Sequence, residues 1–86
     1  MWYVYILKSE ADGQFYVGST RDLKRRLLEH QNGTCRSTKH RRPVALEAYI
    51  AVKEQGTARA LEEYLKSGSG IATLRKRILT SEVPRT

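Results

Sequence analysis

The segment from residue 14 to residue 30 constrains the fold of this chain more than any other. It reads Gln-Phe-Tyr-Val-Gly-Ser-Thr-Arg-Asp-Leu-Lys-Arg-Arg-Leu-Leu-Glu-His. Residues 15–17 carry side chains that favour a strand, and Gly18 marks a point where the backbone bends or is closely approached. The sequence therefore predicts a short strand, a glycine-containing turn and then a helix.

The predicted helix spans about residues 21–31 and is basic and amphipathic. Thr20 is placed to cap its first turn, because a hydroxyl at that position accepts a hydrogen bond from a free backbone amide. With Leu23 at the centre of the buried stripe, Arg26 and His30 are four residues apart and lie on one shoulder of the helix. A tyrosine at the strand end, a guanidinium and an imidazole are thus expected to converge on one edge of a sheet, where they would cradle a phosphate.

A first strand precedes this segment, and turn residues ending in Asp12-Gly13 join the two into a predicted hairpin. If the turn pairs residues whose numbers sum to an odd value, Tyr5 and Tyr16 project from the same face. A bulge at Gly13 would break that parity, so the facing of the two rings is conditional.

The whole chain is expected to form an α+β domain in which a three-stranded antiparallel sheet is flanked by helices, in the order ββαβαα. Asn32-Gly33 should end the first helix, and Val44, Leu46, Ala48 and Ile50 should share one face of the third strand. Strands are expected over about 2–7, 14–18 and 43–52, and helices over 21–31 and 58–67. A third helix is marked by Ile71, Leu74 and Ile78, with Arg75, Lys76 and Arg77 pointing outward. Residues 1–80 should form a single domain, followed by a flexible tail over 81–86.

The charge of the chain is strongly one-sided, since 16 Lys and Arg residues face 9 Asp and Glu residues for a formal net charge of +7. Half of the basic residues lie between Arg21 and Arg42, opposed there only by Asp22 and Glu29. Such a patch favours a polyanion, most often a nucleic acid, although a flexible loop kept soluble by its charge is the alternative. The candidate substrate-binding residues are Gly18, Arg25, Arg36, Lys39, His40, Arg41 and Arg42.

Cysteine content and hydropathy indicate a soluble protein of the cytoplasm. The single cysteine, Cys35, excludes an internal disulfide and fits a reducing compartment. The apolar N-terminal run is too short for a signal sequence, and no run approaches the length of a membrane span. A monomer with no membrane association is expected.

Several motifs of the chain resemble the GIY-YIG endonuclease superfamily. They are Tyr3-Val4-Tyr5, then Tyr16-Val17-Gly18, then Arg26 and His30 in the following helix, and a late Glu62. Residues 37–43 and 63–68 also resemble its small single-domain bacterial members, the UPF0213 or YhbQ-like group. The resemblance covers about residues 2–79, and the fold it implies is the three-stranded sheet with surrounding helices deduced above.

The resemblance implies a metal-dependent DNA endonuclease with Tyr5, Tyr16, Arg26, His30 and Glu62 as its catalytic residues. Glu62 would bind one Mg²⁺ or Mn²⁺ ion weakly, Arg26 would bind the scissile phosphate, and Tyr16 would orient or deprotonate the attacking water. Tyr5 and His30 would orient these groups. His40 lies roughly where some members carry another active-site histidine.

The chain also departs from the family pattern. Tyr3 stands where the first motif has glycine. Neither a separate DNA-binding domain nor the late polar residue of better-characterised members is found.

Each of these residues also has an ordinary structural interpretation. The two tyrosines can be strand aromatics of a small core, and Arg26 can be a solvated helix charge. His30 can complement the helix dipole, and Glu62 can pair with Lys66 one turn later.

Three hypotheses follow for the function. The first is an endonuclease acting in DNA repair or on branched or single-stranded DNA with low sequence specificity, and RNA remains an alternative substrate. The second is a non-cleaving nucleic-acid-binding module of the same fold. The third is a small adaptor whose basic surface meets an acidic protein.

Overall fold

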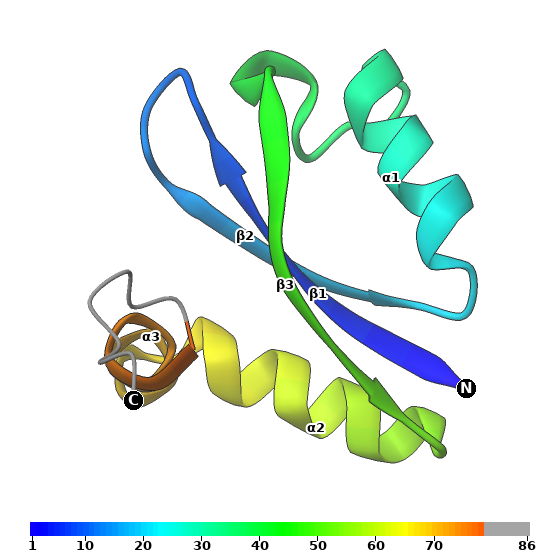
Figure 1. Cartoon of the computed structure of the whole chain (residues 1–86), viewed down its shortest axis with the longest axis vertical. Coiled ribbons are helices and arrows are strands. Elements are labelled where there is room, and N and C mark those ends of the chain that lie inside the picture. The colour runs from blue at the N-terminus through cyan, green and yellow to red at the C-terminus, as the bar shows by residue number, and fades with distance from the viewer. Residues whose placement is uncertain (79–86) are drawn as a thin grey trace, which may run out of the picture.

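The computed structural model describes residues 1–78, and it has the predicted α+β architecture with the strand order β2-β1-β3 (Figure 1). Both strand pairs are antiparallel. The chain therefore confirms the order ββαβαα. Its elements are β1 (Trp2–Ser9), β2 (Phe15–Thr20), α1 (Leu23–Asn32), a 3₁₀ turn η1 (Lys39–Arg41), β3 (Val44–Val52), α2 (Gln55–Lys66), α3 (Gly68–Thr73) and a π-helical turn η2 (Leu74–Ile78).

The register of the β1–β2 hairpin places the two motif tyrosines on one face. Tyr5 pairs with Gly18 and Leu7 pairs with Tyr16, so paired residues sum to an odd number. Because Tyr5 and Leu7 are two residues apart in one strand, their side chains and that of Tyr16 share a face. Gly13 adopts a positive φ of 72° in the turn without shifting this register. The conditional prediction for the tyrosines is confirmed.

The prediction that Val44, Leu46, Ala48 and Ile50 share one face of β3 is wrong, because the register shifts between Leu46 and Ala48. The pairing partner changes from Ala48 opposite Ile6 to Leu46 opposite Leu7, so Glu47 is an extra residue in the ladder. Such a bulge reverses the alternation of side chains. Val44 consequently packs with Tyr5 and Leu7, whereas Ala48 packs against the cluster on the other face.

The two faces of the sheet are covered by different helices (Figure 1). On one face, Val4, Ile6 and Val17 pack with residues of α2 and η2, and on the other face Tyr5, Leu7 and Val44 pack with Leu23 and Leu27 of α1. The predicted stripe of α2 is confirmed, since Ala58 and Leu65 are buried and Leu61 is half-buried. Each layer is thus one helix deep, and the rim of the sheet is close to the surface.

Helix ends explain the remaining differences from the predicted boundaries. The cap of α1 is Asp22, whose Oδ1 accepts from the Arg25 amide at 3.1 Å, and Thr20 instead accepts from the Asp22 amide at 3.1 Å. Gly33 ends α1 in the left-handed conformation with φ 81°, as predicted. The helix α2 begins three residues before the predicted start, because the backbone carbonyl of Glu54 already accepts from the Ala58 amide at 3.1 Å.

The predicted third helix is divided in the structure into the six-residue helix α3 and the π-helical turn η2. Leu74 is buried, but Ile71 is 40% exposed. The side chains of Arg77 and Ile78 and the predicted tail over 81–86 lie outside the part that the structure describes. Across residues 1–78, every helix lacks either the length or the apolar content that crossing a membrane requires.

Candidate active site

A buried chain of three polar side chains lies between β1, α1 and the loop before η1. The Tyr5 hydroxyl is 2.9 Å from His30 Nε2, and His30 Nδ1 is 2.6 Å from Thr38 Oγ1. All three side chains are at most 1% exposed. A neutral imidazole has one N–H and one lone pair, so His30 donates to one hydroxyl and accepts from the other.

Burial determines the protonation states of His30 and Tyr5 in this hydrogen-bonded group. It lowers the pKa of His30, and the nearby Arg26 charge lowers it further. Burial and the neighbouring Tyr16 raise the pKa of Tyr5, which outweighs the opposing effect of Arg26. His30 is therefore neutral and Tyr5 protonated at neutral pH, and the pair orients its surroundings rather than supplying charge.

Tyr16 lies directly against this chain at the edge of the sheet. Its ring centroid is 6.3 Å from that of Tyr5 and 5.2 Å from that of His30. Gly18 leaves the room that this packing needs, because a Cβ at that position would lie 2.5 Å from the Tyr5 hydroxyl. Tyr16 is only half-buried, so it is the motif tyrosine that a solvent-side substrate can reach.

Arg26 projects from α1 beside Tyr5, as the four-residue spacing from His30 predicts. Its Nη1 donates to Glu29 Oε1 at 3.0 Å, and its side chain is 43% exposed. Among the described residues, its Nε is buried without a hydrogen-bond partner. A guanidinium has five N–H donors, so the outer part of this 43% exposed side chain keeps N–H groups that suit an anion such as phosphate.

Glu62 lies on the other face of the sheet from the tyrosines. Ser19 Oγ donates to its Oε1 at 2.7 Å, and Lys66 Nζ donates to its Oε2 at 2.8 Å. Ser19 pairs with Val4, a residue of the α2-side cluster, so Ser19 and Glu62 face α2 while Tyr16 faces α1. The carboxylate and the tyrosine therefore lie on opposite faces of β2, which is an edge strand.

Burial alone would raise the pKa of Glu62, but the hydrogen bonds from Lys66 and Ser19 outweigh it and lower the pKa. Glu62 is therefore ionised at neutral pH. Within residues 1–78 no group of three or more His, Cys, Asp or Glu side chains could hold a metal ion. The donor set fits Mg²⁺ or Mn²⁺ only as a site with one carboxylate that waters and substrate oxygens complete, an arrangement common for Mg²⁺ beside phosphates.

Comparison with known proteins identifies the family to which the chain belongs. The GIY-YIG catalytic domain matches residues 1–75. The chain belongs to the GIY-YIG family. GIY-YIG is a nuclease family, and this is the function class that the motif residues implied.

The curated relatives of this GIY-YIG chain belong to the UPF0213 group. A UPF0213 protein of Aeromonas hydrophila is 38% identical over 69 residues, which cover 79% of this chain and 50% of that protein. One of Desulfotalea psychrophila is 35% identical over 80 residues, covering 91% and 69%, and YhbQ of Escherichia fergusonii is 31% identical over 96 positions, covering 95% and 94%. The chain thus spans half the length of the first of these relatives. No solved structure matches it.

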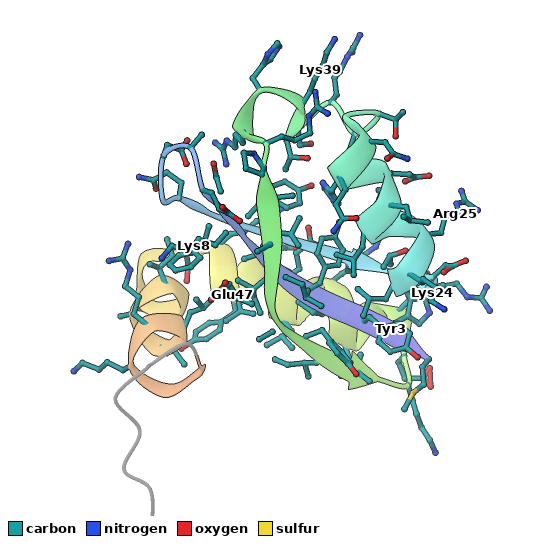
Figure 2. The ribbon with its side chains drawn as sticks, turned by 45° about the horizontal axis from the view of Figure 1, so that its top comes forward. Tyr3, Lys8, Lys24, Arg25, Lys39 and Glu47 are labelled. Carbon is teal, nitrogen blue, oxygen red and sulfur yellow. The ribbon has the colours of Figure 1, made fainter. Side chains whose placement is uncertain are left out.

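The basic residues of this GIY-YIG chain are spread along α1 and η1, with Arg25 and Lys39 on the outer surface (Figure 2). His40 is exposed in η1 and makes no hydrogen bond to the Tyr5–His30–Thr38 chain. Arg42 is engaged in the fold, since its guanidinium donates to the backbone carbonyls of Lys39 and Gln31 and packs against Gly33. Arg25, Arg36, Lys39 and His40 are thus the exposed predicted substrate contacts that are not held in this way, although Arg25 Nε also donates to Glu29 Oε2 at 3.4 Å.

Three residues that contact the candidate catalytic side chains of this GIY-YIG domain were given no catalytic or binding role from the sequence. Thr38 stands in the segment that matched the UPF0213 group, but nothing in that match assigns it to His30. Ser19 follows Gly18, and strand alternation alone could have placed it on the face of Glu62. Lys66 entered only as an alternative partner of Glu62, and the structure shows that the pair forms beside the site.

Proposed function

We propose that the protein is a metal-dependent DNA endonuclease whose substrate lies along the β2 edge of the sheet. One observation supports this proposal most directly. Tyr16 lies on one face of the edge strand β2, with Arg26 beside Tyr5 on that face, and the ionised Glu62 lies on the other face. A phosphodiester placed along that edge would therefore have residues of the site on both sides of it. The match to the GIY-YIG catalytic domain over residues 1–75 also supports the proposal.

The residues divide the work of hydrolysis among them. Arg26 binds the scissile phosphate through its free donors and offsets charge that grows there in the transition state. Tyr16 orients the attacking water or takes its proton, and Tyr5 and His30 fix the position of the Tyr16 ring through their contacts. Glu62 would hold Mg²⁺ or Mn²⁺, which would supply Lewis-acid stabilisation of the leaving oxygen.

The remaining features of the proposal follow from the surface. Arg25, Arg36, Lys39, His40 and Arg41 would contact phosphates along the strand. Phosphate contacts position a protein but do not read bases, so low sequence specificity is proposed, with branched or single-stranded DNA of repair as the substrate class. RNA with the same phosphate spacing is the alternative substrate. A monomer acting in the cytoplasm is part of this proposal.

A second candidate is a nucleic-acid-binding module that no longer cuts. Its support is specific, because Ser19 and Lys66 already occupy both oxygens of Glu62. If Lys66 never leaves, the carboxylate is neutralised in place and binds no ion. The basic surface then remains as the functional feature.

Nicking assays separate the two candidates. Plasmid and a forked duplex are incubated with Mg²⁺, Mn²⁺ or EDTA, using wild type, Glu62→Gln, Arg26→Ala and the neighbouring Glu63→Gln as a matched control on an exposed position of α2. The endonuclease predicts metal-dependent nicking that Glu62→Gln and Arg26→Ala abolish and Glu63→Gln retains. Equal nicking by wild type and Glu62→Gln would indicate a contaminating nuclease, and no nicking on any substrate would favour the binding module.

Salt dependence separates both candidates from an adaptor for acidic proteins. A protein that contacts several phosphates loses DNA affinity steeply as salt rises, because bound counterions are released on binding. Absence of measurable DNA binding at low salt would leave only the adaptor.

A further inference from the structure

A pocket next to the proposed catalytic edge has a lining that the hydrolysis does not use. It lies between β2 and the helices α2 and α3, has a volume of about 200 Å³, and is lined by Phe15, Ile71 and Leu74 together with the polar side chains of Gln14, Lys66 and Arg75. Small-molecule sites usually have volumes of roughly 300–1,000 Å³. The pocket therefore suits a single ring system rather than a larger ligand.

Positive charge surrounds the aromatic part of this pocket. Arg75 Cζ lies 5.8 Å from the centroid of the Phe15 ring, and Lys8 Nζ lies 5.9 Å from the same centroid. Lys8 is visible on the side of the molecule that carries α3 (Figure 2). An apolar floor with an aromatic ring and several cations is the combination with which proteins bind single-stranded nucleic acid.

The pocket is also continuous with the proposed active site. Tyr16 is one of its lining residues, and Lys66, which lines it too, holds the carboxylate of Glu62 at 2.8 Å. A nucleotide seated here would place its phosphate near the β2 edge. A free phosphate alone would not require the apolar floor, and an apolar ligand alone would not require Lys66 and Arg75.

We propose that this pocket binds one nucleobase of a single-stranded DNA segment, with Lys66 and Arg75 on the phosphates that flank it. The base packs against Phe15, Ile71 and Leu74, and the amide of Gln14 is positioned to hydrogen-bond to its edge. The inference deepens the proposed nuclease function by naming single-stranded DNA as the substrate form, but base binding itself needs no cleavage.

The test compares two short oligonucleotides in EDTA, where no metal-dependent cutting occurs. One is oligothymidylate, and the other has the same length and phosphates but only abasic sites. Their affinities are measured by fluorescence anisotropy with wild type, Ile71→Glu and Leu28→Glu. Ile71 is 40% exposed and Leu28 is 53% exposed, so each variant places a carboxylate on an exposed apolar position, one at the pocket and one on α1.

Wild type is expected to bind oligothymidylate about 5- to 150-fold more tightly than the abasic strand, the range for one stacked base. Leu28→Glu should keep this ratio, and Ile71→Glu should bring it close to one. Equal binding of the two strands by wild type, or an unchanged ratio in Ile71→Glu, would overturn the proposal.

A second variant tests the phosphate contact separately. Arg75→Gln should weaken binding of both strands and reduce the slope of log affinity against log salt by about one. An unchanged slope would contradict the role given to Arg75. Because all arms are run without cutting, loss of the base preference and loss of nicking are distinguishable failures.

Discussion

Gly18 is the residue on which the geometry of the two tyrosines depends most simply. A Cβ there would lie 2.5 Å from the hydroxyl oxygen and 2.6 Å from Cζ of Tyr5, a ring that is 1% exposed and cannot move aside. Gly18→Ala should therefore destabilise the fold by about 1–3 kcal/mol, the usual cost of overpacking a core. Urea unfolding measures the change.

The control for Gly18→Ala is Gly56→Ala, since a Cβ on Gly56 meets nothing within 4 Å. Alanine in that first turn of α2 should leave stability unchanged or raise it by up to about 1 kcal/mol. Equal stability of Gly18→Ala and wild type would show that the Tyr5 ring is not fixed where the structure has it.

Thr38 should matter because it is the only described partner of His30 Nδ1, at 2.6 Å. Thr38→Val keeps the shape of the side chain but leaves a buried ring nitrogen unpaired, which should cost about 1–3 kcal/mol. Thr38→Ser keeps the hydroxyl and should retain most of that stability. Chemical denaturation of the three proteins tests this, and equal losses in Val and Ser variants would mean that the methyl group, not the hydrogen bond, is important.

The lowered pKa of His30 predicts a pH dependence with a definite sign. Because the folded state binds the proton more weakly than the unfolded state, whose histidine titrates near pH 6.5, stability should fall as pH drops below about 6.5. The slope reaches at most about 1.4 kcal/mol per pH unit for one proton. The lowered pKa values of Glu62 and Glu29 act only at lower pH, because these carboxylates lose their contribution to stability below their ordinary pKa of 4.5.

Urea midpoints at pH 7.5 and 5.5 measure this dependence. The exposed His40→Gln variant is the control and should keep the full decrease. His30→Asn should be less stable throughout and nearly flat between the two pH values. A wild-type protein equally stable at both would contradict the neutral, buried histidine.

At the residue scale, sequence reasoning succeeded where spacing determines geometry and failed where distant segments meet. Tyr5 and Tyr16 face together because hairpin register follows from strand alternation. Thr38 and His30 are eight residues apart with a helix end and a loop between them, and no periodicity relates them. Their contact depends on how the loop folds back onto α1.

The helix α2 carries the candidate metal-binding carboxylate, Glu62, and its pairing with Lys66 is a contact within that one helix. The two side chains are one helical turn apart, and their exposed fractions are 21% for Glu62 and 51% for Lys66. An exposed ion pair of this kind contributes about 0.2–1 kcal/mol. A metal ion that binds Glu62 has to displace Lys66 first.

Lys66→Met should therefore raise the affinity of the DNA-free protein for Mn²⁺ by about 1.5- to 5-fold, the factor that this energy corresponds to. Electron paramagnetic resonance of free Mn²⁺ measures the affinity without any assay of activity. Glu63→Gln should change nothing, and Glu62→Gln should remove the gain. Weaker Mn²⁺ binding by Lys66→Met would show that the lysine does not compete with the ion.

The bulge in β3 shows what local pattern could not determine about an element. Alternation along 43–52 predicted one apolar face, yet Val44 and Ala48 pack on opposite faces because Glu47 is an extra residue opposite β1. A bulge depends on the partner strand as well as on the strand itself. By contrast, Gly33 ended α1 as predicted, since the left-handed cap is a local requirement of the backbone.

At the scale of the whole molecule, the order of elements and the sheet could be predicted because each strand and helix is short, periodic and bounded by turn residues. The division of the site could not. The resemblance groups Tyr16 and Glu62 as catalytic residues, and the structure has their side chains on opposite faces of the same edge strand. The position of α2 under the sheet results from packing of the whole core, which no single segment determines.

The central claim is that one phosphodiester bound at the edge of β2 contacts both Tyr16 and a metal ion held by Glu62. Paramagnetic broadening tests it most directly, using the protein with Mn²⁺ and a phosphorothioate DNA strand that resists cutting. The claim predicts that adding the strand increases the broadening of the Tyr16 and Arg26 side-chain signals relative to that of the signals beside Glu62, and that Glu62→Gln removes this increase. The same relative broadening with and without the strand would contradict it.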